Sequence, residues 1–281
     1  MKFELTTNTK VAFDKTLFQI RALIDFSHVK AGDLGGWVEK VNNLSQSWDA
    51  WVSEDAWVSG DAQVSGDAQV SGDARVYGDA RVSGDAWVSG DARVYGDARV
   101  SGGAWVYGDA RVSEDAQVFG DARVFGDAQV SGGAWVYGDA QVYGDAQVYG
   151  DARVSGDAWV YGDAQVSGDA WVYGDAQVSG NAQVYGDALV YGDALVSGDA
   201  WVYGDAQVSG DAEKTPINIT GLYYPITITD SHIKIGCEFH TTREWNDFTD
   251  AEIHSMDNDN ACDFWGVHKN TILNLAKYHQ E

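Results

Sequence analysis

The sequence predicts an all-β solenoid, in which short strands coil around a narrow core along most of the chain. The six-residue unit Gly-Asp-Ala-x-Val-(Ser/Tyr), where x varies, repeats in one register over residues 49–212. Val recurs at every sixth position from Val52 to Val208, and Ala does so from Ala50 to Ala212. A fixed short period is typical of solenoids, because each unit buries its apolar side only against its neighbours.

Charge and composition divide the chain into three segments. Residues 1–48 are nearly neutral and are expected to form an N-terminal cap that ends in an irregular first coil over 35–48. Residues 49–212 form the repeat array, with twenty-seven Asp and Glu against seven Arg. Residues 213–281 hold both Pro and five of the six His, and are expected to form a small α+β module that caps the rod and docks to partners.

Each letter of the repeat has a physical role. The β-branched Val between polar or aromatic residues predicts a short strand with Val pointing inward. Gly-Asp predicts the corner, because Gly accepts unusual backbone angles and Asp can accept hydrogen bonds from turn amides. Ala is small enough for the corner to close. Three such edges give a triangular coil of eighteen residues, so the array predicts about nine coils.

The repeat resembles the hexapeptide repeat of left-handed parallel β-helices, in which a small residue follows an aliphatic one by four places. The resemblance covers 49–212 and implies the left hand, since the usual crossover rule favours the right. Many members of this family are acyltransferases, and they commonly form trimers with parallel axes. Residues 24–46 look like the entry segment of some hexapeptide-repeat proteins, and the tail resembles segments of phage and prophage proteins.

Composition excludes several classes of partner and compartment. A formal net charge of −25 argues against direct binding to nucleic acid or to an anionic membrane. We expect no membrane span and no secretion signal, because no apolar run is long enough. Two cysteines, Cys237 and Cys262, are too few for a disulfide framework. The expected location is therefore the cytoplasm, of a bacterial host if the protein is phage-encoded.

Residues eighteen apart are expected to stack on one face of the rod. At the variable position, face 1 carries Trp57, Arg75, Arg93, Arg111, Gln129, Gln147, Gln165, Gln183 and Trp201. Face 2 carries Trp51, Gln69, Trp87, Trp105, Arg123, Gln141, Trp159, Gln177 and Leu195. Face 3 carries Gln63, Arg81, Arg99, Gln117, Trp135, Arg153, Trp171, Leu189 and Gln207. Like residues form runs, as stacking between parallel strands favours, so one interpretation is that the columns only stabilise the coil.

The number of outward aromatic residues predicts self-association. The outer positions of the array carry eight Trp, eleven Tyr and two Phe. A large exposed aromatic surface marks an interface or an aggregation site, so we expect a homo-oligomer, most simply a trimer. The candidate interface residues, all on face 2, are Trp87, Trp105, Tyr107, Phe125, Tyr143, Trp159 and Tyr161.

Face 1 offers a candidate ligand site. Arg75, Arg93 and Arg111 stack in one column, and Tyr77 and Tyr95 lie beside it. Arginine next to an aromatic ring suits a nucleotide-like or other small anionic ligand, and clefts between subunits would repeat the site. The alternative is that these arginines pair with neighbouring Asp.

An enzyme is disfavoured. The acyltransferases that the repeat resembles use a His as general base, and the array has no His and no inserted loop. We predict no catalytic residue, no cofactor and no bound metal. Cys237, His240, His254, Cys262 and His268 in the tail could be zinc ligands, but their spacing fits no finger pattern.

The Asp columns allow two further alternatives. Asp precedes each array Ala except at Gly103, Gly133 and Asn181. Carboxylates one coil apart repel by about 0.9 kcal/mol in water, so either turn amides satisfy them or cations such as Ca²⁺ lie between coils. One charge per roughly 2 Å of rod also approaches the density of duplex DNA, so an acidic DNA mimic that binds nucleic-acid-handling host proteins is a further possibility.

The tail predicts a hairpin and a helix. The stretch ITITDSHIKIGCEF alternates around Asp230 and Ser231, as a hairpin does. After Asp259, apolar residues recur at helical spacing and predict a helix of fifteen or more residues. The whole sequence predicts a non-enzymatic, self-associating scaffold or binding protein.

Overall fold

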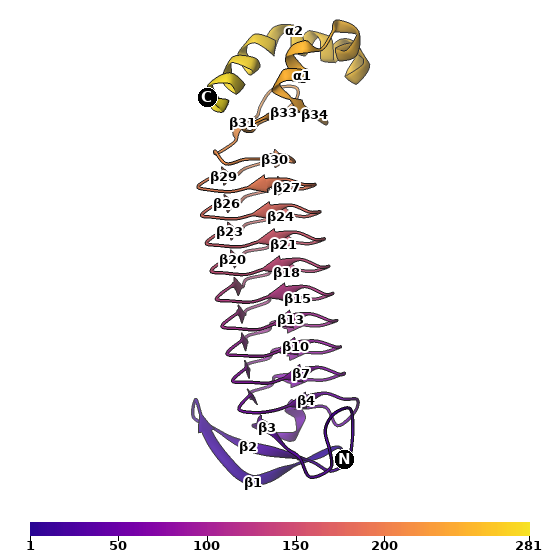
Figure 1. Ribbon diagram of the computed structural model, residues 1–281, viewed down its shortest axis with the longest axis vertical. Helices are drawn as coiled ribbons and strands as arrows, with labels where there is room; N and C mark the ends of the chain where they lie inside the picture. Colours follow the sequence, from indigo (N-terminus) through magenta and orange to yellow (C-terminus); the bar gives the residue numbers. More distant parts are fainter.

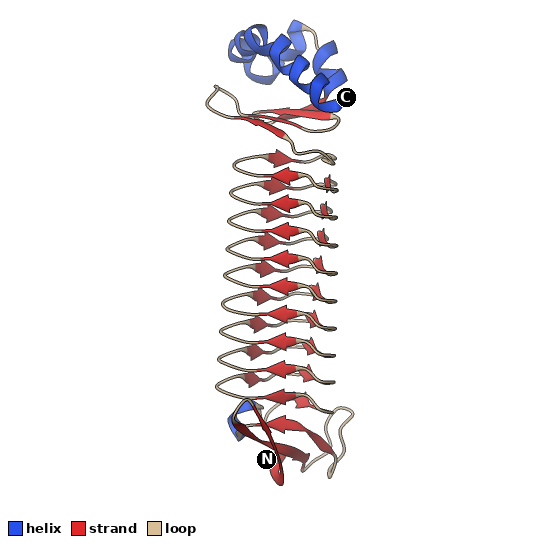
Figure 2. Ribbon diagram, turned by 90° about the vertical axis from the view of Figure 1, so that its left-hand side faces the viewer, coloured by secondary structure: helices blue, strands red, loops and turns tan.

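The repeats form one long rod. The computed structural model describes residues 1–281 and shows a stack of coils between a strand-rich N-terminal cap and a C-terminal module of strands and helices (Figure 1). Parallel sheets run along the three sides of the coils, each with nine strands from the array (Figure 2). The predicted β-solenoid is confirmed.

Each array strand contains two residues, the variable residue and Val. Face 1 contains β5 (Trp57–Val58), β8 (Arg75–Val76), β11 (Arg93–Val94), β14 (Arg111–Val112), β17 (Gln129–Val130), β20 (Gln147–Val148), β23 (Gln165–Val166), β26 (Gln183–Val184) and β29 (Trp201–Val202). Face 2 contains β4 (Trp51–Val52), β7 (Gln69–Val70), β10 (Trp87–Val88), β13 (Trp105–Val106), β16 (Arg123–Val124), β19 (Gln141–Val142), β22 (Trp159–Val160), β25 (Gln177–Val178) and β28 (Leu195–Val196). Face 3 contains β6 (Gln63–Val64), β9 (Arg81–Val82), β12 (Arg99–Val100), β15 (Gln117–Val118), β18 (Trp135–Val136), β21 (Arg153–Val154), β24 (Trp171–Val172), β27 (Leu189–Val190) and β30 (Gln207–Val208).

The hexad builds the coil edge as its letters predict. Every Val and Ala of the array is at most 1% exposed, and together they form one apolar core along the rod. Corner glycines adopt left-handed angles, with φ of +68° at Gly60 and +77° at Gly78. A Cβ on Gly60 would approach the Gly78 carbonyl oxygen to 2.9 Å, so this corner selects Gly for its backbone angle and for space.

Hydrogen bonds between coils have a consistent direction. The amides of Trp51 and Ser53 donate to the carbonyls of Ala68 and Val70, one coil further on, at 3.0 and 2.9 Å. The same pattern recurs along the array. The first coil therefore leaves mainly carbonyls without partners, and the last coil leaves mainly amides.

The N-terminal cap extends face 1. Strands β1 (Phe3–Ala12) and β2 (Lys15–Ala22) form an antiparallel hairpin, and β2 pairs antiparallel with β3 (Leu34–Val38). Strand β3 pairs parallel with β5, and the 3₁₀ helix η1 (Val41–Asn43) follows it. Leu44 then pairs with Val64, so residues 35–48 follow the path of an irregular first coil.

Side-chain donors cover the carbonyls at the N-terminal end. The Lys2 ammonium donates to the carbonyls of Ala50 at 2.6 Å and Trp48 at 3.1 Å. The Asn43 amide donates to the Ala62 carbonyl at 2.8 Å. Lys2 is 3% exposed, and this burial lowers its pKa from 10.5 to about 8, against the opposing attraction of nearby Asp residues.

Side-chain acceptors cover the amides at the C-terminal end. The Thr215 hydroxyl accepts from the Trp201 amide at 3.2 Å, and the Thr227 hydroxyl accepts from the Gln207 amide at 3.4 Å. Lys234 fixes the C-terminal module to face 3, since its ammonium donates to the Gln207 side-chain oxygen at 2.6 Å. Both ends of the solenoid are thus closed by groups of the polarity that each end requires.

The C-terminal module is a four-stranded antiparallel sheet with two helices. Its strands are β31 (Ile217–Ile219), β32 (Ile226–Ile228), β33 (His232–Ile235) and β34 (Glu238–Thr241), and its helices are α1 (Thr242–Asp247) and α2 (Asp250–Gln280). The predicted hairpin is formed by β32 and β33. The predicted helix lies within α2, whose backbone breaks at Asp257 and Asn258. The first half of α2, all of α1 and the outer strands were not predicted.

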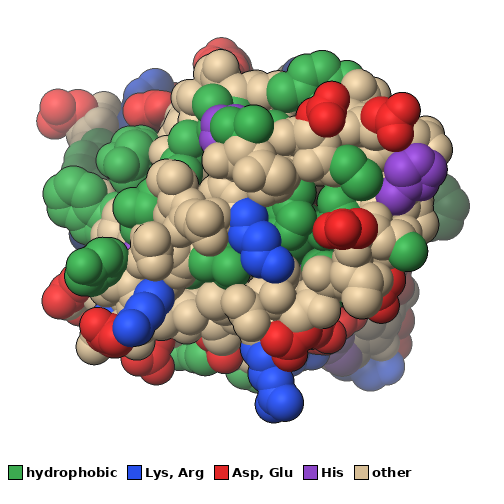
Figure 3. Space-filling model, turned by 90° about the horizontal axis from the view of Figure 1, so that it is seen from above, with side chains coloured by type: hydrophobic (Ala, Val, Ile, Leu, Met, Phe, Trp, Pro, Cys, Tyr) green, Lys and Arg blue, Asp and Glu red, His purple; other side chains and the backbone are tan.

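The outer end of this module is a mixed surface. Viewed along the rod from that end, hydrophobic side chains alternate with acidic, basic and polar surface (Figure 3). Neither helix combines the length and apolar character needed to cross a bilayer.

Candidate functional site

The coil geometry sets the outward side chains in columns. Strand pairing is in register, so Arg75, Arg93, Arg111 and Gln129 lie opposite one another in turn on face 1. On face 2, Trp87 lies opposite Trp105, and Trp105 lies opposite Arg123. The predicted columns on all three faces follow from this eighteen-residue register, which the sequence period already contains.

The array arginines form no ion pairs. Asp columns run beside the array arginines. No array Arg, however, has a nitrogen within 4.0 Å of a carboxylate oxygen. The alternative that Arg75, Arg93 and Arg111 are held by neighbouring Asp is therefore wrong. Their guanidinium groups keep their donors available for another molecule.

The two tyrosines predicted beside the arginine column stack on each other. The Tyr77 and Tyr95 rings are 5.0 Å apart and 3° from parallel. Tyr77 also contacts the rings of Trp57 at 5.7 Å and Phe13 at 6.5 Å. Burial raises the pKa of Tyr77, and the neighbouring arginines oppose that shift. Tyr77 is thus enclosed by rings, whereas Tyr95 faces the small Ser113 on the next coil.

The N-terminal hairpin adds residues to this site that the sequence did not predict. Its tip places the Phe13 ring 5.7 Å from Trp57, and the Lys10 ammonium donates to the Asp55 carbonyl at 3.0 Å. Burial lowers the pKa of Lys10 against the opposing attraction of Asp55 and Asp73, and the positive charge of Arg75 adds a smaller lowering. A fourth cation therefore lies at the lower end of the arginine column. Because the hairpin is outside the repeat, no periodicity could place it there.

The candidate interface residues form two adjacent columns on face 2. The Trp87 and Trp105 rings stack at 5.6 Å, and these side chains are 46% and 45% exposed. Beside them, a continuous stack joins the rings of four residues at 4.9, 4.8 and 5.1 Å, namely Tyr107, Phe125, Tyr143 and Tyr161. Trp159 meets Tyr143 edge to face at 6.4 Å and is 39% exposed. The structure brings all seven predicted residues onto one surface.

The corner carboxylates are not satisfied by turn amides, as one alternative expected. Several corner amides bond to the next coil instead, as the Asp67 amide does to the Gly84 carbonyl at 2.9 Å. Within the array, the Asp67 carboxylate accepts from the Asp49 amide and the Asp199 carboxylate accepts from the Asn181 side chain. Most of the other Asp carboxylates in the columns are exposed.

A notch interrupts the tyrosine column of face 1. It has a volume of about 390 Å³ and lies beside Gln129 and Gln147, between Glu114 and Tyr149, with Ser131 in its wall. Every other array tyrosine stacks on an aromatic ring, whereas Tyr149 stacks on none and is 38% exposed. Ser113 and Ser131 occupy the two preceding positions of its column, so the notch is the space of missing rings.

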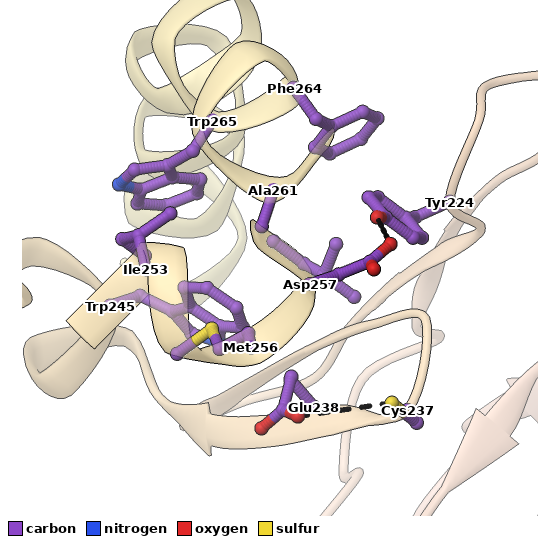
Figure 4. Close-up of a pocket in the computed structure, with 11 residues that line it drawn as sticks. Tyr224, Cys237, Glu238, Trp245, Ile253, Met256, Asp257, Ala261, Phe264 and Trp265 are labelled. Atoms are coloured by element: carbon purple, nitrogen blue, oxygen red, sulfur yellow. Dashed lines mark hydrogen bonds between the residues drawn. The ribbon is translucent and has the colours of Figure 1, made fainter. Parts of the chain in front are cut away.

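The C-terminal module contains a small apolar cavity. It measures about 50 Å³ and lies between the sheet and the break in α2 (Figure 4). The Tyr224 hydroxyl donates to the Asp257 carboxylate at that break, which raises the pKa of Tyr224 to about 12. Trp245 and Met256 lie on the opposite side of the cavity (Figure 4). The cavity is a gap in the packing of the module, too small for a nucleotide.

The histidines and cysteines of the tail have structural neighbours. His232 stacks on Phe239 at 4.7 Å, and His240 packs edge to face against Trp245 at 5.3 Å. No group of three or more His, Cys, Asp or Glu side chains is placed to hold a metal ion. Both cysteines are free thiols. The candidate zinc ligands are therefore not brought together.

Comparison with known families agrees with the fold. The model of the YdcK beta solenoid repeat matches residues 68–79, 74–90, 92–108, 116–132, 146–162, 164–180, 176–191, 182–198 and 188–204. These segments lie within the array and together cover less than half of the chain. No curated protein sequence matches the chain significantly. The family match and the stacked parallel sheets together show that the chain is a β-solenoid repeat protein.

Proposed function

We propose that this protein is a non-enzymatic scaffold or binding protein that self-associates as a trimer through its solenoid. The observation that supports this proposal is the aromatic surface of face 2, where tryptophans nearly half exposed lie beside a stack of four rings. A surface of this kind is costly to leave in water and is typical of an interface. The rod and its caps supply rigidity rather than a reactive group.

Sedimentation velocity at micromolar concentration tests self-association. A trimer of the 30.4 kDa chain is expected, and a monomer would contradict the proposal. Replacing Trp87 and Trp105 by Gln should shift the protein toward monomer. Replacing Trp135 and Trp171 by Gln on face 3 is the matched control, since these side chains are 38% and 39% exposed. The control variant should stay assembled.

A second candidate function is the binding of a small anionic ligand on face 1. It is supported by the unpaired guanidinium groups of Arg75, Arg93 and Arg111, together with the ammonium of Lys10 nearby. Replacing Arg75 and Arg93 by Gln should leave the thermal unfolding midpoint nearly unchanged, because Gln already continues the column. Affinity for a nucleotide such as ATP should fall about 100-fold, given roughly 1.5–3 kcal/mol per charged hydrogen bond. A lack of binding by the unmodified protein would remove this candidate.

We further propose that the coil is left-handed, that the protein acts in the bacterial cytoplasm, and that a phage encodes it. The hand is supported by the hexapeptide pattern, and the compartment by the two free thiols. Phage origin is supported by the resemblance of the tail alone. Circular dichroism cannot report the hand of the coil, so a crystal structure is the test of that element.

A further inference from the structure

We propose that, in the self-association described above, face 2 of one copy packs against face 1 of the next at equal height, with Arg123 entering the notch beside Tyr149. This inference rests on the proposed self-association and specifies its surfaces. It makes one arginine and one notch the elements that fix the register between copies.

Symmetry restricts which surfaces can meet. In a closed ring of parallel rods, rotation moves each residue to a new copy without changing its height along the axis. A triangular rod then contributes one corner to the axis and the two faces beside that corner to its neighbours. Three such rings are possible, one for each corner of the coil, and we call each of them a closure. Each closure sets particular columns opposite one another.

The corner between faces 2 and 1 gives complementary outer columns. The outer columns are those farther from the corner, namely the variable position on face 2 and the Ser/Tyr position on face 1. Each variable residue of face 2 lies opposite the Ser/Tyr-position residue that follows it by eight residues. That residue belongs to the neighbouring copy and is about 2 Å higher along the rod. Large residues meet Ser in the pairs Trp105–Ser113, Arg123–Ser131 and Trp159–Ser167. Shorter residues meet Tyr in the pairs Gln69–Tyr77, Gln141–Tyr149, Gln177–Tyr185 and Leu195–Tyr203. Trp87 and Tyr95 are the exception.

The inner columns of the same closure, which lie next to the corner, are also complementary; they are the Ser/Tyr position on face 2 and the variable position on face 1. The ring stack of face 2 lies opposite the glutamine column of face 1, in the pairs Phe125–Gln129, Tyr143–Gln147 and Tyr161–Gln165. Below them, serines of face 2 lie opposite arginines of face 1, in the pairs Ser71–Arg75 and Ser89–Arg93. Tyrosine hydroxyls can therefore meet amide side chains, and two of the three arginines meet small residues that leave room for them. Tyr107 and Arg111 are the exception in these columns.

The other two closures oppose large residues. Closure at the corner between faces 3 and 2 sets Arg99, Trp135 and Arg153 opposite Tyr107, Tyr143 and Tyr161. Closure at the corner between faces 1 and 3 sets Tyr77, Tyr95 and Tyr149 opposite Arg81, Arg99 and Arg153, and it leaves the aromatic surface of face 2 uncovered. Size complementarity thus favours the corner between faces 2 and 1.

The notch suits a guanidinium group. Arg123 is the only basic residue in the variable column of face 2 and is exposed. It forms no ion pair, and its guanidinium lies 5.7 Å from the Trp105 ring of its own copy. In this closure it lies opposite Ser131, in the wall of the notch, between the Glu114 carboxylate and the open Tyr149 ring. Guanidinium groups bind carboxylates and stack on aromatic rings. The chain already uses that stacking within one copy, where the Arg153 guanidinium lies 4.7 Å from the Trp171 ring.

The backbone conformation of Glu114 also supports the placement of Arg123 in the notch. Glu114 occupies a corner position where nearly all others are Gly, and its φ is +60°. One carboxylate oxygen accepts from the Gly132 amide at 2.8 Å, which fixes the side chain beside the notch. The carboxylate can still accept further hydrogen bonds from an incoming arginine.

Disulfide trapping tests the face assignment directly. A chain with Arg123→Cys is mixed with a chain carrying Ser131→Cys, allowed to exchange subunits and oxidised. Mass spectrometry should then find a peptide that joins positions 123 and 131, and neither chain alone should give it. Trimers without this peptide would overturn the face assignment and leave self-association intact, whereas monomers would overturn both proposals.

Affinity measurements test the role of the arginine. Arg123→Ala should raise the dissociation constant of the assembly at least about tenfold, because it removes a charged contact at each interface. Arg81→Ala on face 3 is the control, since Arg81 is also exposed and forms no ion pair but lies outside this closure. Equal effects of the two substitutions would overturn the proposal. Ser131→Trp, which fills the notch, should also weaken assembly, while Ser83→Trp on face 3 should not.

Discussion

At the scale of single residues, the repeat departs from its pattern where a neighbouring coil compensates. Glu54 and Glu114 adopt φ of +57° and +60° at corners otherwise built from Gly, which costs about 1–2 kcal/mol for a residue with a side chain. Each carboxylate accepts the amide of the Gly one coil further on, at 2.7 and 2.8 Å. A charged hydrogen bond of this kind offsets much of the backbone cost.

Val130→Asp tests the assignment of inside and outside. Val130 is fully buried among Val and Ala, so a carboxylate there has no partner and should lower the free energy of unfolding by about 3 kcal/mol or more. The control is Gln129→Asp, which adds the same charge to an exposed neighbour. Thermal unfolding followed by circular dichroism compares the two. Equal midpoints would refute the inward direction of Val.

Lys2 gives the protein a specific alkaline pH dependence. Its pKa is about 8 in the folded chain and 10.5 as a free side chain, so between these values the unfolded chain binds more protons than the folded chain. Stability should therefore rise with pH across that range. The cost of the buried charge, up to about 3 kcal/mol, is relieved as the ammonium loses its proton.

The comparison with Lys2→Met isolates this effect from other titrating groups. Denaturant unfolding at pH 7.5, 8.5, 9.5 and 10 should show the unmodified protein gaining stability relative to the variant. The difference should grow mainly above pH 8. A difference that stays constant with pH would mean that Lys2 keeps an ordinary pKa in the folded chain.

At the scale of elements, the two caps differ because the two ends of the solenoid differ in polarity. Lys2 and Asn43 supply donors where carbonyls are exposed, and Thr215 and Thr227 supply acceptors where amides are exposed. Unpaired strand edges invite end-to-end pairing with other chains, so the caps also limit growth of the rod.

Thr227→Val tests the C-terminal cap. The substitution keeps the shape of a side chain that is 5% exposed but removes the acceptor for the Gln207 amide, at a cost of about 1 kcal/mol. Hydrogen exchange at Gln207 should become several-fold faster, while amides in the middle of the array keep their rates. Thr220→Val, at an exposed site with no such bond, is the control. Unchanged exchange at Gln207 would show that this hydroxyl does not cap the strand.

The sequence predicted the elements that repeat and missed those that do not. The eighteen-residue coil assigns Arg93 and Trp105 to their columns because one register holds throughout. The contact of Phe13 with Tyr77 has no such signal, since the hairpin reaches face 1 by a tertiary path. The break of α2 at Asp257 likewise has no periodic signal, and the Tyr224 hydroxyl that donates to Asp257 is distant in sequence. The notch beside Tyr149 could have been found by reading the Ser/Tyr column as closely as the variable column.

At the scale of the whole molecule, assembly must overcome like charge. The chain carries a net charge of −25, and the array holds most of it on exposed carboxylates. In the closure proposed here, the Asp column at the corner between faces 2 and 1 comes close to the axis. Arg75, Arg93 and Arg111 lie beside its lower half, whereas Asp127, Asp145 and Asp163 have only Gln beside them.

Assembly should therefore strengthen as salt rises. The screening length falls from about 10 Å at 0.1 M to about 3 Å at 1 M, which weakens repulsion between carboxylates while the burial of aromatic rings persists. Sedimentation velocity at 20, 150 and 500 mM NaCl should show a dissociation constant that decreases with salt. Replacing Asp127, Asp145 and Asp163 by Asn should tighten assembly at 20 mM and flatten the salt response. The same change at Asp139, Asp157 and Asp175, which lie at the corner between faces 3 and 2, should have a smaller effect, because that corner is away from the axis. A dissociation constant that increases with salt would instead mean that opposite charges, and not aromatic surfaces, hold the copies together.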